Sequence, residues 1–307
     1  MHSGKRTIST TIYKYFHTPS LQFFNLLDIM AESVKSEKPT VICDLEGEDF
    51  FERFSLKRVK VLGKGMAGEV FLVKAKNGSG RMLAVKKFSF SEDVRERSMR
   101  QFSTEAGVMQ AVPHHHLVPC IVAARCHEYA AIAMPYYARG DLVELCGRQD
   151  PRRVNRYMSH VARAVEHLHK HNIAHNDIKL ENVFVDRSDR AVLGDLGLAL
   201  NVKDGSKTAL AGLVGGTRDY WSPEISEADT HTRIDPFKCD VYAIGVMYWA
   251  LVSGEDPEAD TDFMGRLRAA QDLDLSPSQR STLERLLEPN PVERPTASEI
   301  VKMMQMK

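Results

Sequence analysis

The sequence has few cysteines, and their spacing matches neither a disulfide framework nor a zinc site. There are five of them, an odd number, and no two are separated as C-x-x-C. Reduced thiols of this kind are typical of intracellular proteins. We therefore expect a cytoplasmic protein, and the nucleus stays open as an alternative.

A long apolar run is also missing. The longest uncharged stretch, residues 106–124, contains three histidines and two prolines, which excludes a credible transmembrane helix. The triplet His114-His115-His116 in this stretch offers metal ligands, but the carboxylates that usually complete a metal site are missing around it. A surface turn is the favoured interpretation of the triplet.

Net charge is absent as well, because 41 basic residues balance 41 acidic ones. Nothing in this balance requires nucleic acid or an anionic membrane as a partner, and we expect neither. Residues 1–27 contain no acidic residue, which weakly resembles a mitochondrial transit peptide, although arginine is scarce there. Residues 1–50 are predicted to be a poorly ordered N-terminal extension, with mitochondrial targeting as the less favoured alternative.

Three glycines, Gly63, Gly65 and Gly68, lie between two strand-like segments, 54–62 and 70–75. Because strands flank them on both sides, they do not lead into a helix as in a dinucleotide-binding fold or a Walker loop. Glycine has no Cβ, so its backbone N–H can approach a phosphate closely. Phosphate binding and a plain structural hairpin both remain open on this pattern alone.

Lys86 stands in the middle of a third apolar strand, 82–88. A charged side chain is costly there unless it is paired. The helix expected over 91–112 carries Glu105 next to its apolar face, so we predict an ion pair between Lys86 and Glu105. Two further strands, which complete a small antiparallel sheet, are expected over 121–124 and 130–134.

The second half of the chain is predicted to be mainly helical. Asp150 and Pro151 are typical of the N-cap and first position of a helix. Further helices are expected over 240–251, 276–287 and 296–304. A small sheet and a helical half predict the α+β class, arranged as one large bilobal unit or two small domains.

Two polar motifs lie within the helical half. The loop 175–182, between apolar runs, presents Asp177, Lys179 and Asn182 at offsets of two and three residues. A carboxylate, an ammonium and an amide at this spacing are suited to holding a hydroxyl nucleophile and a metal around a phosphate. Further along the chain, Asp195 follows an apolar strand and precedes a glycine by two residues.

Taken in order, these motifs resemble the signature set of the eukaryotic protein kinase family, and Lys179 fits its serine/threonine type. The resemblance covers residues 54–305. It implies a bilobal fold with a small lobe over 54–134, a hinge over 135–138 and a large lobe over 139–305. It also implies ATP and Mg²⁺ as cofactors and proteins as substrates, and we expect a monomer.

The resemblance also assigns roles by position. Asp177 is the implied catalytic base, and Lys179 and Lys86 are the implied phosphate ligands. Asn182 and Asp195 are expected to hold Mg²⁺. The implied ATP site consists of Leu62, Gly63, Gly65, Gly68, Val70, Ala84, Lys86, Glu105, Met134 and Tyr137.

Supporting roles follow in the same way. Glu224 is expected to pair with Arg294, while Asp240 and Thr217 are expected to bond to the catalytic loop. His175 is expected to be structural. These are structural roles of the family, so none of these residues is counted as catalytic.

The sequence departs from the family at Asn176, where an arginine is usual. That arginine normally receives an activation-loop phosphate, and an amide cannot supply the charge-assisted bonds that a phosphate needs. We therefore expect activity without activation-loop phosphorylation, although Ser206 and Thr208 could be modified. Leu196 for phenylalanine, Ser222 for alanine and Tyr242 for tryptophan are mild changes.

All the implied phosphate, metal and base positions are present, so an active serine/threonine kinase is the expected function. A catalytically weak kinase-fold scaffold is the alternative, supported only by Asn176 and the divergent extension.

Overall fold

The computed structural model describes residues 42–65, 68–76, 79–146, 150–202, 206–270, 273 and 275–305. Of the extension expected over 1–50, residues 1–41, with the possible transit peptide, lie outside the described residues, whereas 42–50 are described and contain β1 (Ile42–Asp44). The chain divides into two compact units. The first unit contains the described residues up to 113 together with 118–136, and the second contains 114–117 and the described residues from 137 onward.

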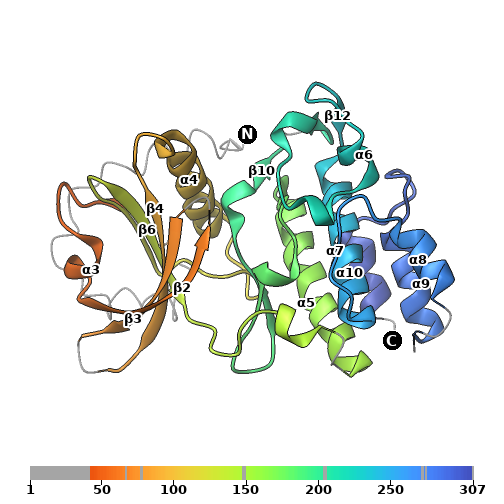
Figure 1. The fold of residues 1–307 in the computed structure, drawn as a ribbon, viewed down its shortest axis with the longest axis horizontal. Helices are drawn as coiled ribbons and strands as arrows, with labels where there is room; N and C mark the ends of the chain where they lie inside the picture. The colour runs from red at the N-terminus through yellow and green to blue at the C-terminus, as the bar shows by residue number, and fades with distance from the viewer. Residues whose placement is uncertain are drawn as a thin grey trace, which may run out of the picture. The chain divides into compact units, whose positions relative to one another are not determined.

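The first unit is built on a six-stranded sheet with the order β1-β5-β6-β4-β3-β2. Its strands are β1 (Ile42–Asp44), β2 (Leu56–Gly65), β3 (Gly68–Ala75), β4 (Met82–Ser89), β5 (Val122–Arg125) and β6 (Tyr129–Pro135). Neighbouring strands are antiparallel, except that β1 runs parallel to β5. Helix α4 (Arg95–Ala111) lies against β4 and β6 (Figure 1). The five predicted strands and the predicted helix are thereby confirmed.

The N-terminal edge of this unit differs from the sequence prediction. The sequence predicts a domain that starts at residue 54, but β1 and helix α3 (Phe50–Arg53) belong to the same unit. Phe50 is completely buried, and its ring lies 4.9 Å from that of Phe54. Asp49 caps α3 and accepts a hydrogen bond from the Tyr129 hydroxyl at 2.7 Å. The aromatic residues before residue 54 are therefore part of the core.

The second unit is mainly helical, as predicted. Its longer helices are α5 (Pro151–Lys170), α7 (Pro236–Ser253), α8 (Phe263–Ala269), α9 (Pro277–Leu286) and α10 (Ala297–Gln305), with a short α6 (Pro223–Ser226). Most residues of α7 are buried, because α7 packs against both α5 and α9 (Figure 1). A helix that is apolar on most of its sides is buried in the core, and the neighbouring helices pack around it.

The segments between these helices contain three short pairs of strands. They are β8 (Val183–Val185) with β9 (Ala191–Leu193), β10 (Leu200–Asn201) with β7 (Ile173–Ala174), and β11 (Ala209–Leu210) with β12 (Arg233–Ile234). The predicted helix caps are also present. The side chain of Asp150 accepts from Arg152 N, and Ser276 and Gln279 form a capping box.

The histidine triplet does not form a surface turn throughout. His116 is only 4% exposed, and its ring stacks at 4.2 Å on that of His160 from α5. The two rings hold the peptide groups of Ala191 from both sides, because His116 Nδ1 donates to its carbonyl and His160 Nδ1 accepts from its N–H. His114 stacks on His167 at 4.8 Å. The triplet therefore anchors β9 to helix α5.

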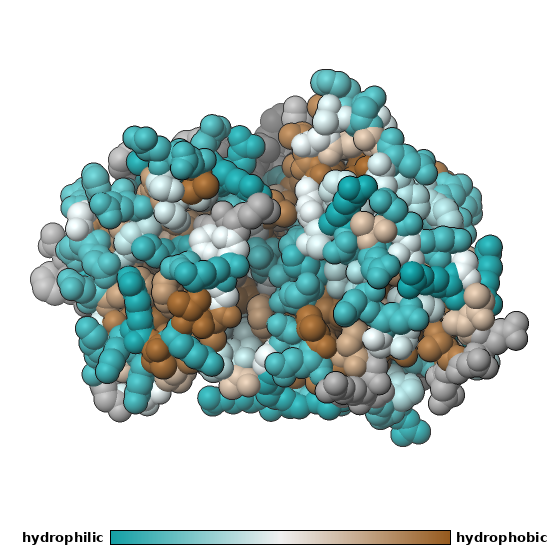
Figure 2. Space-filling model, viewed as in Figure 1, coloured by the Kyte–Doolittle hydropathy of each residue, from teal (hydrophilic) through white to brown (hydrophobic). Residues whose placement is uncertain are grey.

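Hydrophilic residues cover most of the face drawn in Figure 2, with apolar residues scattered between them. Three of the exposed large apolar side chains lie on β2, at Val59, Val61 and Leu62. Single exposed apolar residues are ordinary on protein surfaces. Within the described ranges, no helix has the length and apolarity needed to cross a membrane.

Candidate active site

In the first unit, the predicted ATP-site residues share one face of the sheet. Val70 on β3 is the register partner of Lys86 on β4, and Ala84 on β4 is the partner of Met134 on β6. Side chains two residues apart on a strand, and directly opposite on neighbouring strands, point to the same side. The structure therefore brings these four side chains together. Leu62 lies on β2 and is 38% exposed.

The ion pair predicted between Lys86 and Glu105 is confirmed. Lys86 Nζ lies 2.7 Å from Glu105 Oε2, and the two side chains are 13% and 1% exposed. An unpaired charge at this depth would be strongly unfavourable, so each residue stabilises the charged form of the other. Glu105 comes from α4, which packs against β4.

The three glycines are not equivalent. Gly68 has φ +142°, and a Cβ added there would lie 1.8 Å from the carbonyl oxygen of Lys87. Only glycine therefore fits at residue 68 without displacing the backbone of β4. Gly63 and Gly65 have nothing within 4 Å of an added Cβ. A glycine is required by the fold at 68, whereas at 63 and 65 the space beside the backbone is open.

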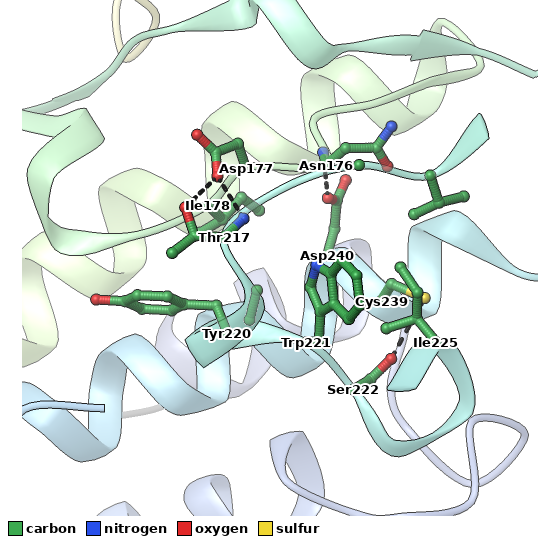
Figure 3. A pocket seen from close by; sticks show the side chains of 13 residues that line it. Asn176, Asp177, Ile178, Thr217, Tyr220, Trp221, Ser222, Ile225, Cys239 and Asp240 are labelled. Atoms are coloured by element: carbon green, nitrogen blue, oxygen red, sulfur yellow. Dashed lines mark hydrogen bonds between the residues drawn. The ribbon is translucent and has the colours of Figure 1, made fainter. Parts of the chain in front are cut away.

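In the second unit, Asp177 is the centre of a hydrogen-bond network. Its Oδ1 accepts from both the backbone N–H and the hydroxyl of Thr217, at 2.9 and 2.8 Å (Figure 3). Its Oδ2 accepts from Asn182 Nδ2 at 3.0 Å and lies 3.1 Å from Lys179 Nζ. Asp177 is 8% exposed. The carboxylate is thus fixed in one orientation, with Thr217 on Oδ1 and with Asn182 and Lys179 on Oδ2.

Lys179 is positioned by the same residues. Its Nζ donates to Thr217 Oγ1 at 2.7 Å, and that hydroxyl donates its own proton to Asp177. Carboxylate, hydroxyl and ammonium therefore form one closed set of charge-assisted contacts. The sequence predicts a bond from Thr217 to this loop, and that contact is confirmed.

Asn182 and Asp195 lie at the open end of the β8–β9 hairpin, opposite its turn. Val183 pairs with Leu193, and Gly194 N donates to Asn182 O at 2.8 Å. Asp195 has a left-handed backbone, with φ 58°, which turns the chain away from β9 at that point. The resemblance implied that the two residues lie close together, and the register of the hairpin is what brings them there.

These two residues fit a hard cation. Asn182 uses its amide nitrogen to bind Asp177, so its amide oxygen is the end suited to a metal ion. A carboxylate and an amide oxygen are ligands that Mg²⁺ accepts, with phosphate oxygens and water completing its shell. Among the described residues, no group of three His, Cys, Asp or Glu side chains is placed to hold a metal by itself.

Asp240, near the start of α7, supports the loop through its backbone. Its Oδ2 accepts from His175 N at 2.8 Å. Its Oδ1 accepts from Asn176 N at 2.8 Å (Figure 3). Asp240 Oδ2 also lies 2.8 Å from His169 Nε2. The His175 ring accepts from Asp177 N and bonds to Gly194 O, at 3.2 and 3.0 Å. The structural roles predicted for Asp240 and His175 agree with these contacts.

Asn176 has an unusual backbone, with φ 67°. Asparagine tolerates this region better than most residues. Its amide nitrogen donates to Leu198 O at 3.0 Å, and its amide oxygen is buried with no hydrogen-bond partner among the described residues. The side chain is therefore directed into the unit and does not offer donors to an exposed anion.

The second predicted ion pair is also confirmed. Arg294 is 2% exposed and donates to both oxygens of Glu224, at 2.6 and 2.7 Å. The guanidinium lies 4.9 Å from the centre of the Tyr242 ring, a cation–π contact that this aromatic residue still provides. Ser222 is fully buried and bonds to Cys239 Sγ at 3.4 Å, and burial raises the pKa of the Cys239 thiol.

Two residues near this network were not found from the sequence. The hydroxyl of Tyr220 accepts from Leu180 N at 3.4 Å, and burial raises the pKa of Tyr220. Arg233 on β12 contacts residues just before β11, and nothing near it in the sequence indicates that contact. The predicted hinge residue Tyr137 belongs to the second unit and stacks on Phe184 at 5.5 Å.

Known proteins resemble this chain over most of its described length. The family of protein kinase domains matches residues 56–305. A probable cell cycle serine/threonine-protein kinase, the CDC5 homolog of Encephalitozoon cuniculi, is 27% identical over 277 residues, which cover 85% of this chain and 56% of that protein. The Aurora kinase of Schizosaccharomyces pombe is 26% identical over 253 residues, covering 79% of this chain and 69% of its own.

The serine/threonine-protein kinase MRCK gamma of Mus musculus is 30% identical over 212 residues, which cover 67% of this chain and 14% of that protein. This chain thus spans less than two thirds of the length of the CDC5 homolog and of MRCK gamma.

Proposed function

The chain belongs to the protein kinase family, and from this premise we propose that it transfers the γ-phosphoryl group of ATP to serine or threonine hydroxyls of proteins. The observation that carries the proposal is the Asp177 carboxylate. It is 8% exposed, and its Oδ1 is held by two donors of Thr217. Such a group can accept a hydrogen bond from a substrate hydroxyl without first reorienting.

Asp177 acts as the base that orients and deprotonates the hydroxyl nucleophile. Thr217 holds Oδ1 with two donors, while Oδ2 lies 3.0 Å from Asn182 Nδ2 and 3.1 Å from Lys179 Nζ, so both oxygens are fixed before a substrate binds. Lys179 holds a positive charge where a transferring phosphoryl group carries negative charge. Most of the rate enhancement comes from this positioning and electrostatic stabilisation.

Asn182 and Asp195 would hold Mg²⁺ at the edge of the β8–β9 hairpin, and Lys86 would bind the α and β phosphates of ATP. When bound, Mg²⁺ supplies positive charge that offsets the charge of the phosphates. Glu105 holds the Lys86 ammonium in place through the contact of 2.7 Å. Val70, Ala84 and Met134 provide an apolar surface on the same face of the sheet, suited to a purine ring.

The test is a phosphoryl-transfer assay on the purified full chain with Mg-ATP and generic protein substrates. The matched controls are Lys86→Met and Asp195→Ala, each of which removes one predicted ligand. Transfer by the wild-type chain that both substitutions abolish would support the proposal. Retained ATP binding without any transfer would instead support a kinase-fold scaffold.

We also propose that activity does not require phosphorylation of the activation segment. The support is Asn176, whose amide nitrogen is bound to Leu198 O and whose oxygen is buried. The position that usually receives the phosphate therefore carries no cation. A chain with Ser206→Ala and Thr208→Ala together is expected to keep its activity, and loss of activity in that variant would contradict this part of the proposal.

A further inference from the structure

Six arginines of the second unit lie where helix α5 begins and where the β8–β9 hairpin turns. These residues, called the arginine patch below, are Arg139, Arg152, Arg153, Arg156, Arg187 and Arg190. Asp189 in the hairpin turn connects the two elements, because arginines of α5 bind its carboxylate. The sequence has no lysine over 139–165 or 186–190, so the positive charge here is carried by guanidinium groups.

Three guanidinium groups share the one carboxylate of Asp189. Its Oδ1 lies 3.0 Å from Arg139 Nη2 and 2.5 Å from Arg153 Nη2. Its Oδ2 contacts Arg156 Nη2. The Tyr157 hydroxyl donates to Oδ1 at 2.8 Å. Asp189 supplies one negative charge to three positive charges, so it balances only one of them.

The other acidic residues of this region do not restore the balance. Asp186 accepts from Arg190 Nε at 2.7 Å and also binds backbone N–H groups of its own turn. Asp150 caps α5 by accepting from Arg152 N. Among the residues that the structure describes, neither Arg152 nor Arg187 forms an ion pair. The patch therefore carries an excess of positive charge.

This charge lies at a position that α5 itself disfavours. The first turn of α5 contains no acidic residue, and Arg152 and Arg156 are four residues apart on one face of the helix. The N-terminus of a helix carries partial positive charge, so cations are unfavourable there, and like charges at this spacing repel each other. Arginines at positions that are unfavourable for the helix indicate a role other than folding.

The outer arginines of the patch are accessible and held in place. The side chains of Arg139 and Arg156 are 42% and 51% exposed. The guanidinium of Arg156 lies 5.8 Å from the centre of the Tyr157 ring, which is fully buried. A guanidinium that is already positioned loses less conformational entropy when it binds an anion. The patch is thus prepared to bind anionic groups from outside the chain.

The contacts of Asp189 indicate which anion fits. Its carboxylate is bound by guanidinium groups from two sides, and a carboxylate of a partner can engage the exposed edges of the same groups in the same way. Proteins that bind single-stranded nucleic acid use exposed aromatic rings to stack the bases, and Tyr157 is buried. These observations favour an acidic protein segment over nucleic acid.

We propose that the arginine patch is a docking surface for a protein segment rich in aspartate and glutamate. The segment binds at the turn of the β8–β9 hairpin, whereas Asn182 and Asp195 lie at its open end. Docking therefore leaves the carboxylate of Asp177 free. Such binding requires no phosphoryl transfer by the chain, so it can be tested separately from the proposed activity.

The test measures the fluorescence anisotropy of a labelled glutamate-rich peptide that is titrated with the full chain. A peptide with glutamine in place of each glutamate is the matched control. We expect saturable binding of the glutamate peptide in salt of about 0.05 M and no binding of the glutamine peptide. In salt of about 0.5 M the affinity should fall at least about tenfold, because screening weakens contacts between exposed charges.

Three variants make the result specific. Arg139→Gln combined with Arg156→Gln should weaken binding at least about tenfold, because two exposed guanidinium groups are lost. Arg97→Gln combined with Arg100→Gln changes the net charge equally on the exposed face of α4, and it should change the affinity less than about twofold. Asp189→Asn removes the competing carboxylate and should tighten binding about threefold, a gain that misfolding cannot produce.

Three results would overturn the proposal. One is the absence of saturable binding by the glutamate peptide, which is the outcome expected if the arginines serve only to anchor the hairpin turn to α5. Another is equal weakening by the substitutions in the patch and by those on α4, which would show that only net charge matters. The third is tighter binding of an oligothymidylate than of the peptide, which would identify a nucleic-acid surface instead.

Discussion

Thr217 binds Asp177 twice, because its backbone N–H and its hydroxyl both donate to the same carboxylate oxygen, at 2.9 and 2.8 Å. The hydroxyl in turn accepts from Lys179 Nζ at 2.7 Å. One threonine from the segment before α6 thus holds both charged residues of the proposed catalytic loop. Its hydroxyl can be removed without removing the backbone contact, which allows a clean test.

Thr217→Val is expected to lower kcat by about 10-fold to 100-fold with little change in the KM for ATP, since hydrogen bonds to charged groups contribute about 1.5–3 kcal/mol. The valine keeps the shape of the side chain and the backbone donor. Thr217→Ser retains the hydroxyl and should keep most of the activity. Steady-state kinetics of all three proteins make the comparison. Wild-type activity in the Thr217→Val variant would show that the hydroxyl has no positioning role.

Substitutions in the Lys86–Glu105 pair can distinguish an effect on stability from an effect on activity. Glu105→Ala leaves the Lys86 ammonium buried without its carboxylate, and such a loss costs about 3–5 kcal/mol of unfolding free energy. Lys86→Met combined with Glu105→Leu replaces both charges with apolar groups and should recover much of that stability, while remaining inactive. Urea unfolding and activity of the single and double variants form the cycle. A double variant no more stable than Glu105→Ala would contradict this account.

The glycines of β2 and β3 should respond differently to the same change. Gly68→Ala places a Cβ 1.8 Å from Lys87 O at φ +142°, so we expect a loss of at least about 2 kcal/mol of stability. Gly63→Ala has nothing within 4 Å of the new atom, and we expect a change within about 0.5 kcal/mol. Amide hydrogen exchange in β3 and β4 measures the local effect. Equal protection in both variants would argue against the steric explanation.

The histidines around β9 predict a dependence of stability on pH. Burial and neighbouring positive charge lower the pKa of both His114 and His160 to about 4, from an ordinary value of 6.5. Arg163 contributes to both shifts, and His116 and Arg190 also act on His160. Between pH 6.5 and about 4, these histidines are protonated in the unfolded chain and neutral in the folded chain, so the unfolded chain binds more protons. The stabilisation is therefore complete above pH 6.5 and is lost as the pH falls toward about 4.

Urea midpoints should be measured from about pH 7.5 to about pH 4.5. They should fall most steeply below pH 6.5, where the unfolded chain takes up protons that the folded chain does not. His160→Asn provides the control, because an amide oxygen can still accept from Ala191 N but does not take up a proton in this range. The variant should show a shallower fall than wild type. The same steep fall in both proteins would mean that other groups cause the pH dependence.

Much of this fold was accessible from the sequence because its signals are local. The strands, the long helices and the Asp150 cap depend on apolar spacing and on capping residues within one or two turns. The Lys86–Glu105 contact could be predicted because a buried charge needs a partner, whereas the Glu224–Arg294 contact followed only from the resemblance to the kinase family. The α+β class and the division into a sheet-containing part and a helical part were predicted from the same local signals.

The contacts that sequence reasoning missed are all non-local. The pair of β11 and β12 joins two strands of two residues each, too short for any periodic signal, so Arg233 looked like an ordinary surface residue. The stack of His116 on His160 joins a connecting segment to the middle of α5. Strand β1 was missed because three residues, Ile42–Asp44, form a strand only through their partner β5.

Strand β1 has a practical consequence for anyone who shortens this chain. It is the outermost strand of the sheet, and its removal leaves the backbone of β5 as an open edge. A chain begun at residue 54 would lose that cover together with Phe50 and Phe51. Exposed strand edges recruit strands from other molecules, so such a protein is expected to aggregate during expression. A start before Ile42 keeps the edge protected.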